Sequence, residues 1–376
     1  MKTIRIGLVG TGFSAALHAE AYRLVHGYDA CICAAASPAP DAKAFAKKYG
    51  IPSVYGSMKE MLAAQEIDLV DICTPPCMHV SMIREALAAK KHVISEKPLT
   101  GWFGNPQDPR MLEHVTEELD SLREAVNASG KHFFYAENFV YAPSVQKSRG
   151  LIKAAGDKVL FLRGEESHSG SHAPHAALWS ANGGGSLIRQ GCHPLSALLY
   201  LKGAQAGNCG VVDVMGDMGY LVPALTEQER RHISARPKDV EDLANVTFTF
   251  SDGTKGSVTA GDMVLGGVRN TVEVFTTGGA HRCNIAPNDA MQVYHVEDEK
   301  LQNEYFTEKL ETRRGWQSVF LDESYARGYV GELQDFLMCA AGDKANPESG
   351  FALAYETTRV IYAAYQSALL GKRISL

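Results

Sequence analysis

The glycine-rich turn at residues 10–15 constrains the fold more than any other feature of the sequence. Gly10-Thr11-Gly12-Phe13-Ser14-Ala15 directly follows the apolar run Ile4–Val9. In a strand–turn–helix unit, the first glycine allows the tight turn, the second lets a pyrophosphate approach the backbone, and a small third residue lets the helix pack closely on the strand. Free amides at the start of the helix attract the phosphates. Gly10, Gly12 and Ala15 therefore predict a dinucleotide site.

Short apolar runs alternate with stretches of helical length over residues 1–135, which is typical of βαβ units and a parallel sheet. Ser57 lies three residues before Glu60, which predicts a capping box, and the apolar spacing in Glu113–Asn127 predicts a helix. We expect a doubly wound Rossmann domain over residues 1–136, with Gly101–Arg110 as a surface insertion. The expected strands are Ile4–Val9, Ala30–Ala36, Leu69–Cys73, His92–Ser95 and Lys131–Tyr135.

After residue 137 the pattern changes to β-branched runs separated by Ser251-Asp252-Gly253 and Gly278-Gly279, which are turn sequences of hairpins. The expected strands here are Val246–Phe250, Lys255–Ala260 and Thr271–Thr276. Leu353–Leu370 has helical spacing and ends at Gly371. We therefore expect an α/β chain whose second domain, residues 137–376, is α+β with a large, open, mostly antiparallel sheet.

The composition points to a small molecule as partner. The net charge is −6, the sequence pI is about 6.1 and no block of Lys or Arg stands out, which argues against nucleic acid or an anionic membrane. No stretch reaches the ~18 consecutive apolar residues of a membrane-spanning helix. An apolar strand begins soon after Met1, which predicts no export signal and a cytoplasmic protein. The eight cysteines show no repeated spacing and are expected to be free thiols.

The end of the second strand bears on which dinucleotide is bound. An acidic side chain there would bond the ribose 2′-hydroxyl of NAD, and an arginine would accept the 2′-phosphate of NADP. Ala35-Ala36-Ser37-Pro38 offers neither, and Ser37 can bond to both cofactors. A dianionic phosphate without a cation would lose its hydration uncompensated, which favours NAD. NADP is not excluded, because Lys43 or another nearby base would permit it.

Two further segments end strands at the carboxyl edge, where ligands of open α/β sheets bind. They are Thr74-Pro75-Pro76 and Ser95-Glu96-Lys97-Pro98. Lys97 can donate to a substrate oxygen, and burial beside a cationic nicotinamide would lower its pKa toward proton exchange. Pro98 fixes the turn and is a candidate cis proline. The alternative is that Lys97 is an ordinary surface lysine and Thr74-Pro75-Pro76 an ordinary turn.

The order of these motifs resembles the Gfo/Idh/MocA family of glucose–fructose oxidoreductases, inositol dehydrogenases and relatives. After the glycine-rich turn, Thr74-Pro75-Pro76 and Glu96-Lys97-Pro98, the sequence continues with Gly183-Gly184-Gly185 and Gly191-Cys192-His193. The resemblance implies that Lys97 lies against nicotinamide and substrate, and that His193 is the general acid/base of hydride transfer. It also implies a second domain that binds substrate and pairs into homodimers or homotetramers.

Arg189 departs from the family pattern, which usually has an aspartate four residues before the histidine. On a helix, residues 189 and 193 share a face one turn apart. A permanent cation there suits a carboxylate, sulfate or phosphate group, and the missing aspartate puts ordinary polyol dehydrogenation in doubt. The alternative is an internal ion pair of Arg189 with a glutamate; the candidates are Glu137, Glu165 and Glu166.

A histidine-rich loop and the start of the second domain supply further candidates. His168, His172 and His175 share a loop with Gly170 and Pro174, and they would ligate zinc or manganese only if a turn gathered them. We predict a polar pocket lining there and no metal.

Glu137-Asn138-Phe139-Val140-Tyr141 lies at the junction where relatives contact substrate, and Asn138 is the preferred contact. The alternative for its aromatic rings is packing in the domain seam. We assign cofactor contacts to Gly10, Gly12, Phe13, Ser14, Ala15, Ser37, Thr74, Pro75, His79, Glu96, Lys97 and Asn138. We assign substrate contacts to Lys97, Asn138, Tyr141, His168, His172, Trp179, Arg189 and His193.

Three functions are consistent with these features. The first is NAD(P)-dependent transfer of hydride between nicotinamide and a secondary alcohol of a sugar, glycoside or acidic sugar derivative, with Lys97 and His193 as catalytic residues. The second is an enzyme that keeps its NAD bound and recycles it during elimination or epimerisation of a keto sugar. The third is a non-catalytic NAD-binding regulatory protein, which Arg189 favours but the presence of Lys97 and His193 does not.

Overall fold

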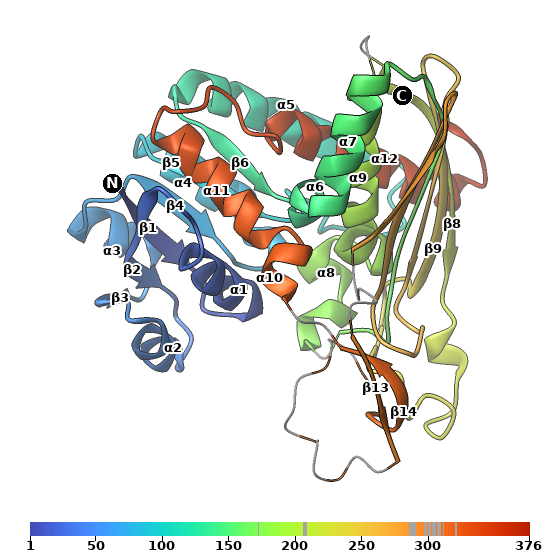
Figure 1. The fold of residues 1–376 in the computed structure, drawn as a ribbon, viewed down its shortest axis with the longest axis horizontal. Coiled ribbons are helices and arrows are strands. Elements are labelled where there is room, and N and C mark those ends of the chain that lie inside the picture. Colours follow the sequence, from blue (N-terminus) through green and yellow to red (C-terminus); the bar gives the residue numbers. More distant parts are fainter. Residues whose placement is uncertain are drawn as a thin grey trace.

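The chain is described by a computed structural model that covers residues 1–171, 173–205, 209–285, 291–296, 299, 302, 306, 310, 312–319 and 322–376. Figure 1 shows two sheets that stand apart in the molecule, with helices between them and along their faces. Residues 2–136 contribute the strands of one sheet, and residues 159–375 contribute those of the other, larger one. This arrangement confirms the predicted fold class.

The first sheet has six parallel strands in the order β3-β2-β1-β4-β5-β6. All five predicted strands occur within two residues of their expected ends, and the three-residue strand β3 was not predicted because it is too short for a periodic signal. The strands are β1 (Lys2–Val9), β2 (Tyr28–Ala36), β3 (Ser53–Tyr55), β4 (Leu69–Ile72), β5 (His92–Glu96) and β6 (Phe133–Ala136).

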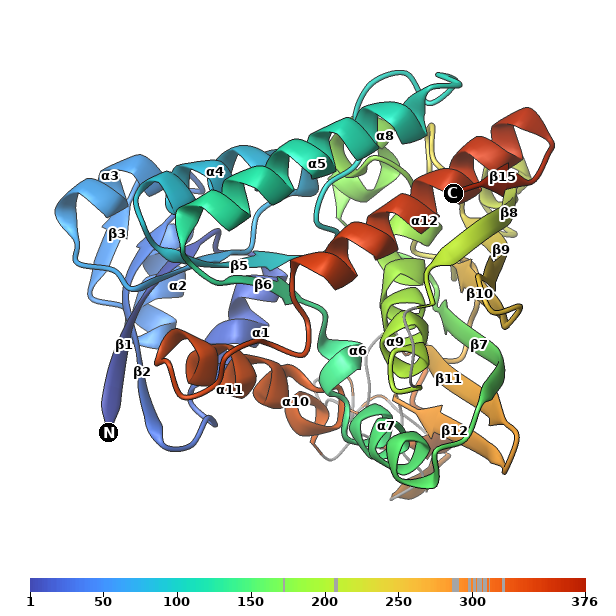
Figure 2. The same ribbon diagram turned by 90° about the horizontal axis from the view of Figure 1, so that it is seen from above.

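Helices cover both faces of this sheet. Figure 2 shows α4 and α5 over one face and α1 over the other. The helices are α1 (Phe13–Tyr22), α2 (Ala42–Tyr49), α3 (Met58–Ala64), η1 (Pro76–Met78), α4 (His79–Ala88) and α5 (Met111–Ser129). Ser57 Oγ accepts from the Glu60 amide as predicted, whereas the Glu60 carboxylate accepts from the amide of Gly56. The predicted apolar stripe of α5 is buried at Val115, Leu119 and Leu122.

The second sheet has the order β12-β11-β7-β10-β9-β8-β15 and is antiparallel except for the pair β7 and β10. Two long helices, α9 and α12, pack on it. Its strands are β7 (Val159–Ser167), β8 (Val211–Gly219), β9 (Leu243–Phe250), β10 (Lys255–Gly261), β11 (Arg269–Thr276), β12 (Ala280–Asn284) and β15 (Ile374–Ser375). A separate pair is formed by β13 (Gln292–His295) and β14 (Gly315–Ser318).

Helices of several lengths follow β6 in the chain, and some of the shorter ones carry predicted site residues. They are α6 (Asn138–Tyr141), α7 (Pro143–Ala155), η2 (Pro174–Ala177), α8 (Trp179–Asn182), the π-helical turn η3 (Leu187–Gly191), α9 (Cys192–Lys202), η4 (Val222–Ala224), α10 (Glu323–Ala326), α11 (Tyr329–Ala340) and α12 (Phe351–Leu370). Helix α12 ends at Gly371, which has φ +61°, as the predicted C-cap requires.

The last helices of the chain return to the first sheet. Helix α11 packs on α1 and α12 on α5, and Figure 2 shows both beside the Rossmann sheet. The segment Gly101–Arg110 lies at the surface as predicted, except that Gly101 is buried and the amide of Trp102 donates to the hydroxyl of Tyr362 on α12 at 2.6 Å. The seam between the two sheets is therefore built from segments far apart in the sequence.

None of the helices in the described ranges is long and apolar enough to cross a membrane. All eight cysteines fall in those ranges, and they are free thiols as predicted.

Candidate active site

The turn after β1 has the shape that its glycines predict. Gly10 has φ +98°, and a Cβ atom at this position would lie 2.3 Å from the carbonyl oxygen of Cys73. A Cβ atom at Gly12 would meet nothing within 4 Å, so the space in front of the turn is open. Ala15 is fully buried between helix and sheet. The backbone at this turn can therefore approach a phosphate closely.

The N-terminus of α1 is free to receive that phosphate. Gly12 is the N-cap residue, and no side chain caps the helix. The amides of its first turn are thus available to an anion, which the positive end of the helix dipole also attracts. Phe13 is 69% exposed and Ser14 is half-buried beside it. Open space and uncapped amides together fit the pyrophosphate of a dinucleotide.

Ser37 lies just after β2, where a residue would contact the ribose of a bound dinucleotide. Its Oγ accepts from Thr11 Oγ1 at 3.0 Å and from the amide of Ala39 at 3.2 Å. Because both contacts use the oxygen as acceptor, the hydroxyl proton remains available for donation to a neutral ribose hydroxyl. Lys43 is exposed on α2.

His79 bridges two turns at the C-terminal edge of the Rossmann sheet, the one after β4 and the one after β5. Its ring is fully buried, with Nδ1 2.8 Å from the carbonyl oxygen of Pro98 and Nε2 2.9 Å from that of Thr74. The half-buried Thr74 and the exposed Pro75 lie on the turn that the ring supports. His79 was predicted to contact the cofactor; its ring nitrogens face backbone carbonyls, so we assign it the positioning of this turn. The Lys97–Pro98 peptide is cis.

Lys97 is half-buried and directed into the seam between the sheets. Its Nζ donates to the carbonyl oxygen of Arg189 at 2.8 Å. Burial by itself would lower the pKa of Lys97. Nearby acidic groups, among them Glu96, Glu166 and Glu137, raise this pKa by more than burial lowers it, so it lies above the usual value of a lysine. The predicted lowering of the Lys97 pKa is therefore not found in the protein by itself. The side chain is a stable ammonium.

Glu96 is buried, with contacts to its own turn and to α1. Its Oε2 accepts from the amide of Lys97 at 2.9 Å, and its Oε1 lies 3.4 Å from Nε2 of the buried His18. Burial raises the pKa of Glu96, but His18 and Lys97 lower it more, so the carboxyl stays ionised. His18 in turn contacts Asp71 through Nδ1 at 2.9 Å. Sequence reasoning missed His18 and Asp71, because each looks like an isolated polar residue in an apolar stretch.

His193 has its ring fixed by two contacts. Nδ1 lies 2.6 Å from Glu137 Oε1, and the ring stacks on Phe139 with centroids 4.8 Å apart. Glu137 is fully buried and lies at the start of α6, whereas His193 is in the first turn of α9. Among the described residues Nε2 makes no hydrogen bond, so this atom is left for a substrate. Glu137 was considered as a partner of Arg189; it holds His193 instead.

The π-helical turn before His193 explains how Lys97 is held. In such a turn the amide of residue i+5 bonds to the carbonyl of residue i. Five residues after Arg189 stands Pro194, which has no N–H to donate. The Arg189 carbonyl accepts from Lys97 Nζ instead.

The Gly183–Gly185 triplet lets this turn pack on Glu241. A Cβ atom at Gly185 would lie 1.9 Å from the carbonyl oxygen of Glu241. The buried Glu241 carboxylate accepts from the amides of Gly185 and Leu187 and from the hydroxyl of Tyr365. The helical segment that leads into His193 is thus anchored at its start by one buried carboxylate.

Arg189 forms an internal ion pair, but not with a glutamate. Its Nη2 contacts Oδ2 of Asp262, and Gln190 Nε2 contacts the other carboxylate oxygen. Asp262 follows β10 directly and is buried. The expected pairing with Glu137, Glu165 or Glu166 was therefore wrong in its partner. The signal that could have found Asp262 is a lone carboxylate just beyond an apolar strand end.

The other predicted substrate contacts lie deeper in the protein. Asn138 Nδ2 donates to the Arg327 carbonyl at 2.8 Å, and the hydroxyl of Tyr141 donates to Asp335 at 2.7 Å. Trp179 is buried with its ring edge-on to Tyr365. His168 is buried at the end of β7, where its Nδ1 accepts from the amide of Gly170. His172 lies outside the described residues.

Glu137, Cys192 and His193 bring three donor atoms close enough to share a metal ion. Nδ1 of His193 is already bonded to Glu137, and burial raises the pKa of the Cys192 thiol well above its usual value, so the thiolate ligand is disfavoured. His168 and His175 join no such group within the described part of the chain. The arrangement therefore fits proton chemistry at His193 better than metal coordination.

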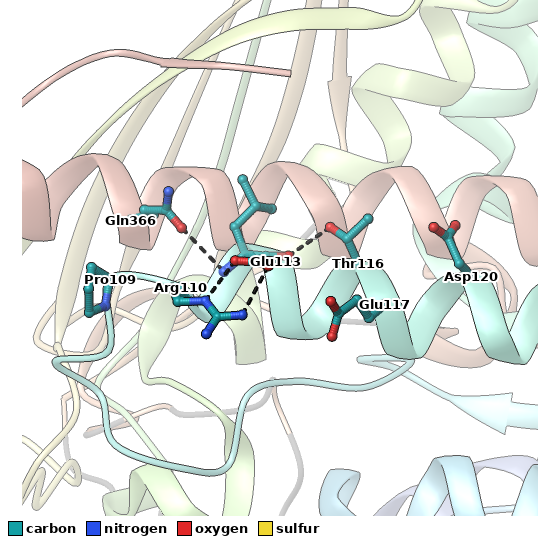
Figure 3. A pocket seen from close by; sticks show the side chains of 8 residues that line it. Pro109, Arg110, Glu113, Thr116, Glu117, Asp120 and Gln366 are labelled. Atoms are coloured by element: carbon teal, nitrogen blue, oxygen red, sulfur yellow. Dashed lines mark hydrogen bonds and ion pairs between the residues drawn. The ribbon is translucent and has the colours of Figure 1, made fainter.

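A pocket of about 320 Å³ lies away from these residues, between α5 and α12. Figure 3 shows acidic side chains of α5, Glu113, Glu117 and Asp120, along it, with Gln366 of α12 opposite. Arg110 bonds Glu113 within the pocket. No group of the Lys97–His193 site lines it.

The fold and the site define an oxidoreductase class: a dinucleotide-binding Rossmann domain with a lysine and a histidine at the seam to a second sheet. Residues 4–126 match the family described as "Oxidoreductase family, NAD-binding Rossmann fold", and residues 158–282 match the "GFO/IDH/MocA C-terminal domain". The chain therefore belongs to the Gfo/Idh/MocA family of oxidoreductases, as the order of its motifs predicted.

Individual relatives match the full length of the chain. It is 25% identical to levoglucosan dehydrogenase of Pseudarthrobacter phenanthrenivorans over 406 residues, covering 98% of this chain and 97% of that protein. The structure is similar to GenD2 from gentamicin A biosynthesis in complex with NAD, with a TM-score of 0.82, 22% identity, and 100% and 97% of the two chains covered. It is also similar to scyllo-inositol dehydrogenase from Lactobacillus casei with bound NAD(H) and scyllo-inositol, with a TM-score of 0.76, 19% identity, and 100% and 99% covered.

Proposed function

We propose that the protein oxidises a secondary hydroxyl of a sugar or glycoside, or reduces the matching ketone, with NAD as hydride carrier. Two contacts carry the proposal: Lys97 Nζ donates to the carbonyl oxygen of Arg189, one turn before His193, and Nδ1 of His193 contacts Glu137, a carboxylate that also lies near Lys97. Relatives named for levoglucosan and scyllo-inositol support a polyol as substrate. NAD, when bound, accepts or returns the hydride.

His193 moves the hydroxyl proton. The Glu137 carboxylate accepts a hydrogen bond from Nδ1–H, which leaves the lone pair of Nε2 to take a proton from a substrate hydroxyl. As the imidazolium forms, the same carboxylate stabilises its charge. Stacking on Phe139 keeps the ring in one orientation.

Lys97 stabilises the substrate oxygen rather than exchanging its own proton. Its raised pKa keeps it charged at neutral pH, and an ammonium stabilises the oxygen as it becomes alkoxide-like on loss of the hydroxyl proton, before the hydride leaves and the carbonyl forms. The Arg189 carbonyl takes one of its three N–H bonds and fixes its direction, and the others remain for the ligand.

NAD is the dinucleotide that the ribose end of the site favours. Ser37 offers one hydroxyl proton, which suits a neutral 2′-hydroxyl. The residues at the end of β2 include no arginine or lysine, and Lys43 on the following helix is exposed to solvent. A 2′-phosphate would therefore be poorly compensated for its lost hydration.

The test is to incubate the protein with NAD or NADP and a panel of neutral glycosides, inositols and sugar acids, and to follow the absorbance of NADH or NADPH. Turnover with NAD that is lost in His193→Ala, while that variant still binds NAD, supports the proposal. Absence of turnover with both cofactors in both directions contradicts it. Solvent deuterium in recovered substrate without net NADH would instead indicate internal recycling of bound NAD.

A further inference from the structure

We propose that Arg189 and Asp262 act together as a specificity-determining pair that makes this site take uncharged sugars or glycosides rather than sugar acids. The inference rests on the proposed function and concerns the charge of its substrate. An Arg189 without a counter-ion would favour an anionic ligand. Whether its guanidinium group is already paired inside the protein therefore determines which substrate charge the site accepts.

The guanidinium charge of Arg189 is balanced inside the protein. Nη2 contacts Asp262, and the side chains of Arg189 and Asp262 are only 14% and 3% exposed. Gln190 holds the second oxygen of the same carboxylate. Asp262 is fixed further by its own amide, which donates to the carbonyl of Asp242 at 2.8 Å. An incoming carboxylate would have to displace a buried partner that is already fixed.

The pair lies next to the reacting groups. The Arg189 carbonyl receives Lys97 Nζ at 2.8 Å, and Arg189 stands one turn before His193. Asp262 follows Gly261, whose carbonyl accepts from the amide of His168 at 3.0 Å. The ion pair therefore forms part of the wall on the second-domain side of the site.

The other cations of this region are balanced as well. Lys97 lies near Glu96, Glu137 and Glu166, and Arg327 pairs with Glu323 at 2.8 Å. Burial and the nearby Arg189 lower the pKa of His175, which keeps that imidazole neutral at pH 7. Apart from Lys97, whose ammonium is assigned to the reacting oxygen, a substrate carboxylate would meet Glu137 and Glu166 without a cation among the described residues of this wall.

The donors of Arg189 are not available to grip a carboxylate. Nη2 is bonded to Asp262, and Nε is buried with no hydrogen-bond partner in the part of the chain that the structure describes. Bidentate binding of a carboxylate needs two parallel N–H donors, and Nη2 is already directed to Asp262. The geometry therefore favours a ligand without a carboxylate.

The experiment compares each neutral glycoside that is turned over with its uronide, which differs by a carboxylate in place of the primary alcohol. The wild-type protein should prefer the neutral compound by at least about tenfold in kcat/KM. In Asp262→Asn the freed guanidinium should raise the uronide-to-neutral ratio by at least about tenfold, equivalent to ~1.4 kcal/mol. Thermal unfolding checks that this variant folds.

Two variants separate charge from general damage. The double variant Arg189→Gln/Asp262→Asn removes both charges and should not gain uronide activity. Glu165→Gln removes a carboxylate of β7 that pairs with Arg269, outside the proposed wall, and should leave the ratio unchanged. A wild-type preference for uronides, or an Asp262→Asn variant with an unchanged ratio, overturns the inference.

The preference can also be measured as a ratio of affinities, by calorimetric titration of the NAD-loaded protein with each neutral glycoside and its uronide. If the protein binds the neutral compound more tightly and Asp262→Asn weakens that preference, the role of the pair is supported even where no NADH forms. If the protein shows no such preference, that role is overturned. Failure of the proposed chemistry and failure of this inference are therefore different results.

Discussion

Nδ1 of His193 lies 2.6 Å from Oε1 of Glu137, although the two residues are 56 positions apart in the sequence. The carboxylate is buried at the end of the Rossmann sheet, and the imidazole stands at the start of α9. His193 thus has its carboxylate partner at the end of the Rossmann sheet and not on its own helix.

Glu137→Gln should therefore lower kcat by about 10- to 100-fold while the KM for substrate and the affinity for NAD change little. The amide can still contact Nδ1, but it cannot stabilise the imidazolium that forms during proton transfer. Steady-state kinetics and NAD titration measure both quantities. Glu137→Asp, which keeps the charge, should recover part of kcat. A variant with unimpaired kcat would show that the contact serves folding alone.

Lys97→Met should lower kcat/KM by at least about 100-fold, because the half-buried ammonium proposed to stabilise the alkoxide-like oxygen is lost. Lys97→Arg keeps the charge but not the compact geometry, and should recover only a small part. Lys59→Met, at an exposed position of α3, is the control for loss of a lysine. Equal activity of Lys97→Met and the control would remove Lys97 from the mechanism.

Gly10→Ala and Gly12→Ala should fail in different ways. At Gly10 the positive φ and the contact 2.3 Å from the Cys73 carbonyl should cost at least about 2 kcal/mol of unfolding free energy. At Gly12 the new methyl meets no protein atom, so stability should change by less than about 0.5 kcal/mol. NAD affinity should nevertheless fall at least about tenfold there, because the methyl fills space that the pyrophosphate needs. Urea unfolding and NAD titration separate the two effects; full NAD affinity in a folded Gly12→Ala variant would place the phosphates elsewhere.

Glu241 should make stability depend on pH. Burial raises its pKa from 4.5 to about 7, against hydrogen bonds from the Leu187 amide and the Tyr365 hydroxyl. Between these values the folded state holds a proton that the unfolded state has lost, so the contribution of Glu241 to stability falls as pH rises from about 4.5 to about 7 and is constant above. The shift corresponds to about 3 kcal/mol at ~1.4 kcal/mol per pKa unit.

Chemical unfolding of the dinucleotide-free protein between pH 5 and pH 8 measures this contribution, with Glu241→Gln as the variant that cannot titrate. The difference in unfolding free energy between wild type and variant should change over that range. Glu117→Gln, at an exposed position of α5, should leave the pH dependence as in wild type. Parallel curves for wild type and Glu241→Gln would show that the buried carboxyl keeps an ordinary pKa.

Local sequence patterns were enough to predict the Rossmann domain and the family of the chain. The glycine-rich turn, the alternation of apolar runs and the order of Lys97 and His193 are properties of short segments, and short segments determine strands, turns and helices through backbone geometry and apolar spacing. β3 was missed because three residues carry no period. The buried start of Gly101–Arg110 was missed because its partner, Tyr362, is 260 positions away.

The partners of the charged groups were decided by tertiary structure alone. Any of several carboxylates can pair with Arg189 or His193 in an extended chain, and the choice depends on which strand ends meet at the seam. Once β10 runs beside β7 and α9 starts at the Rossmann edge, Asp262 faces Arg189 and Glu137 faces His193. The sequence by itself determined a dinucleotide-binding oxidoreductase with its lysine and histidine; only packing decided that its arginine is neutralised, because burial allows a charge only beside its counter-charge.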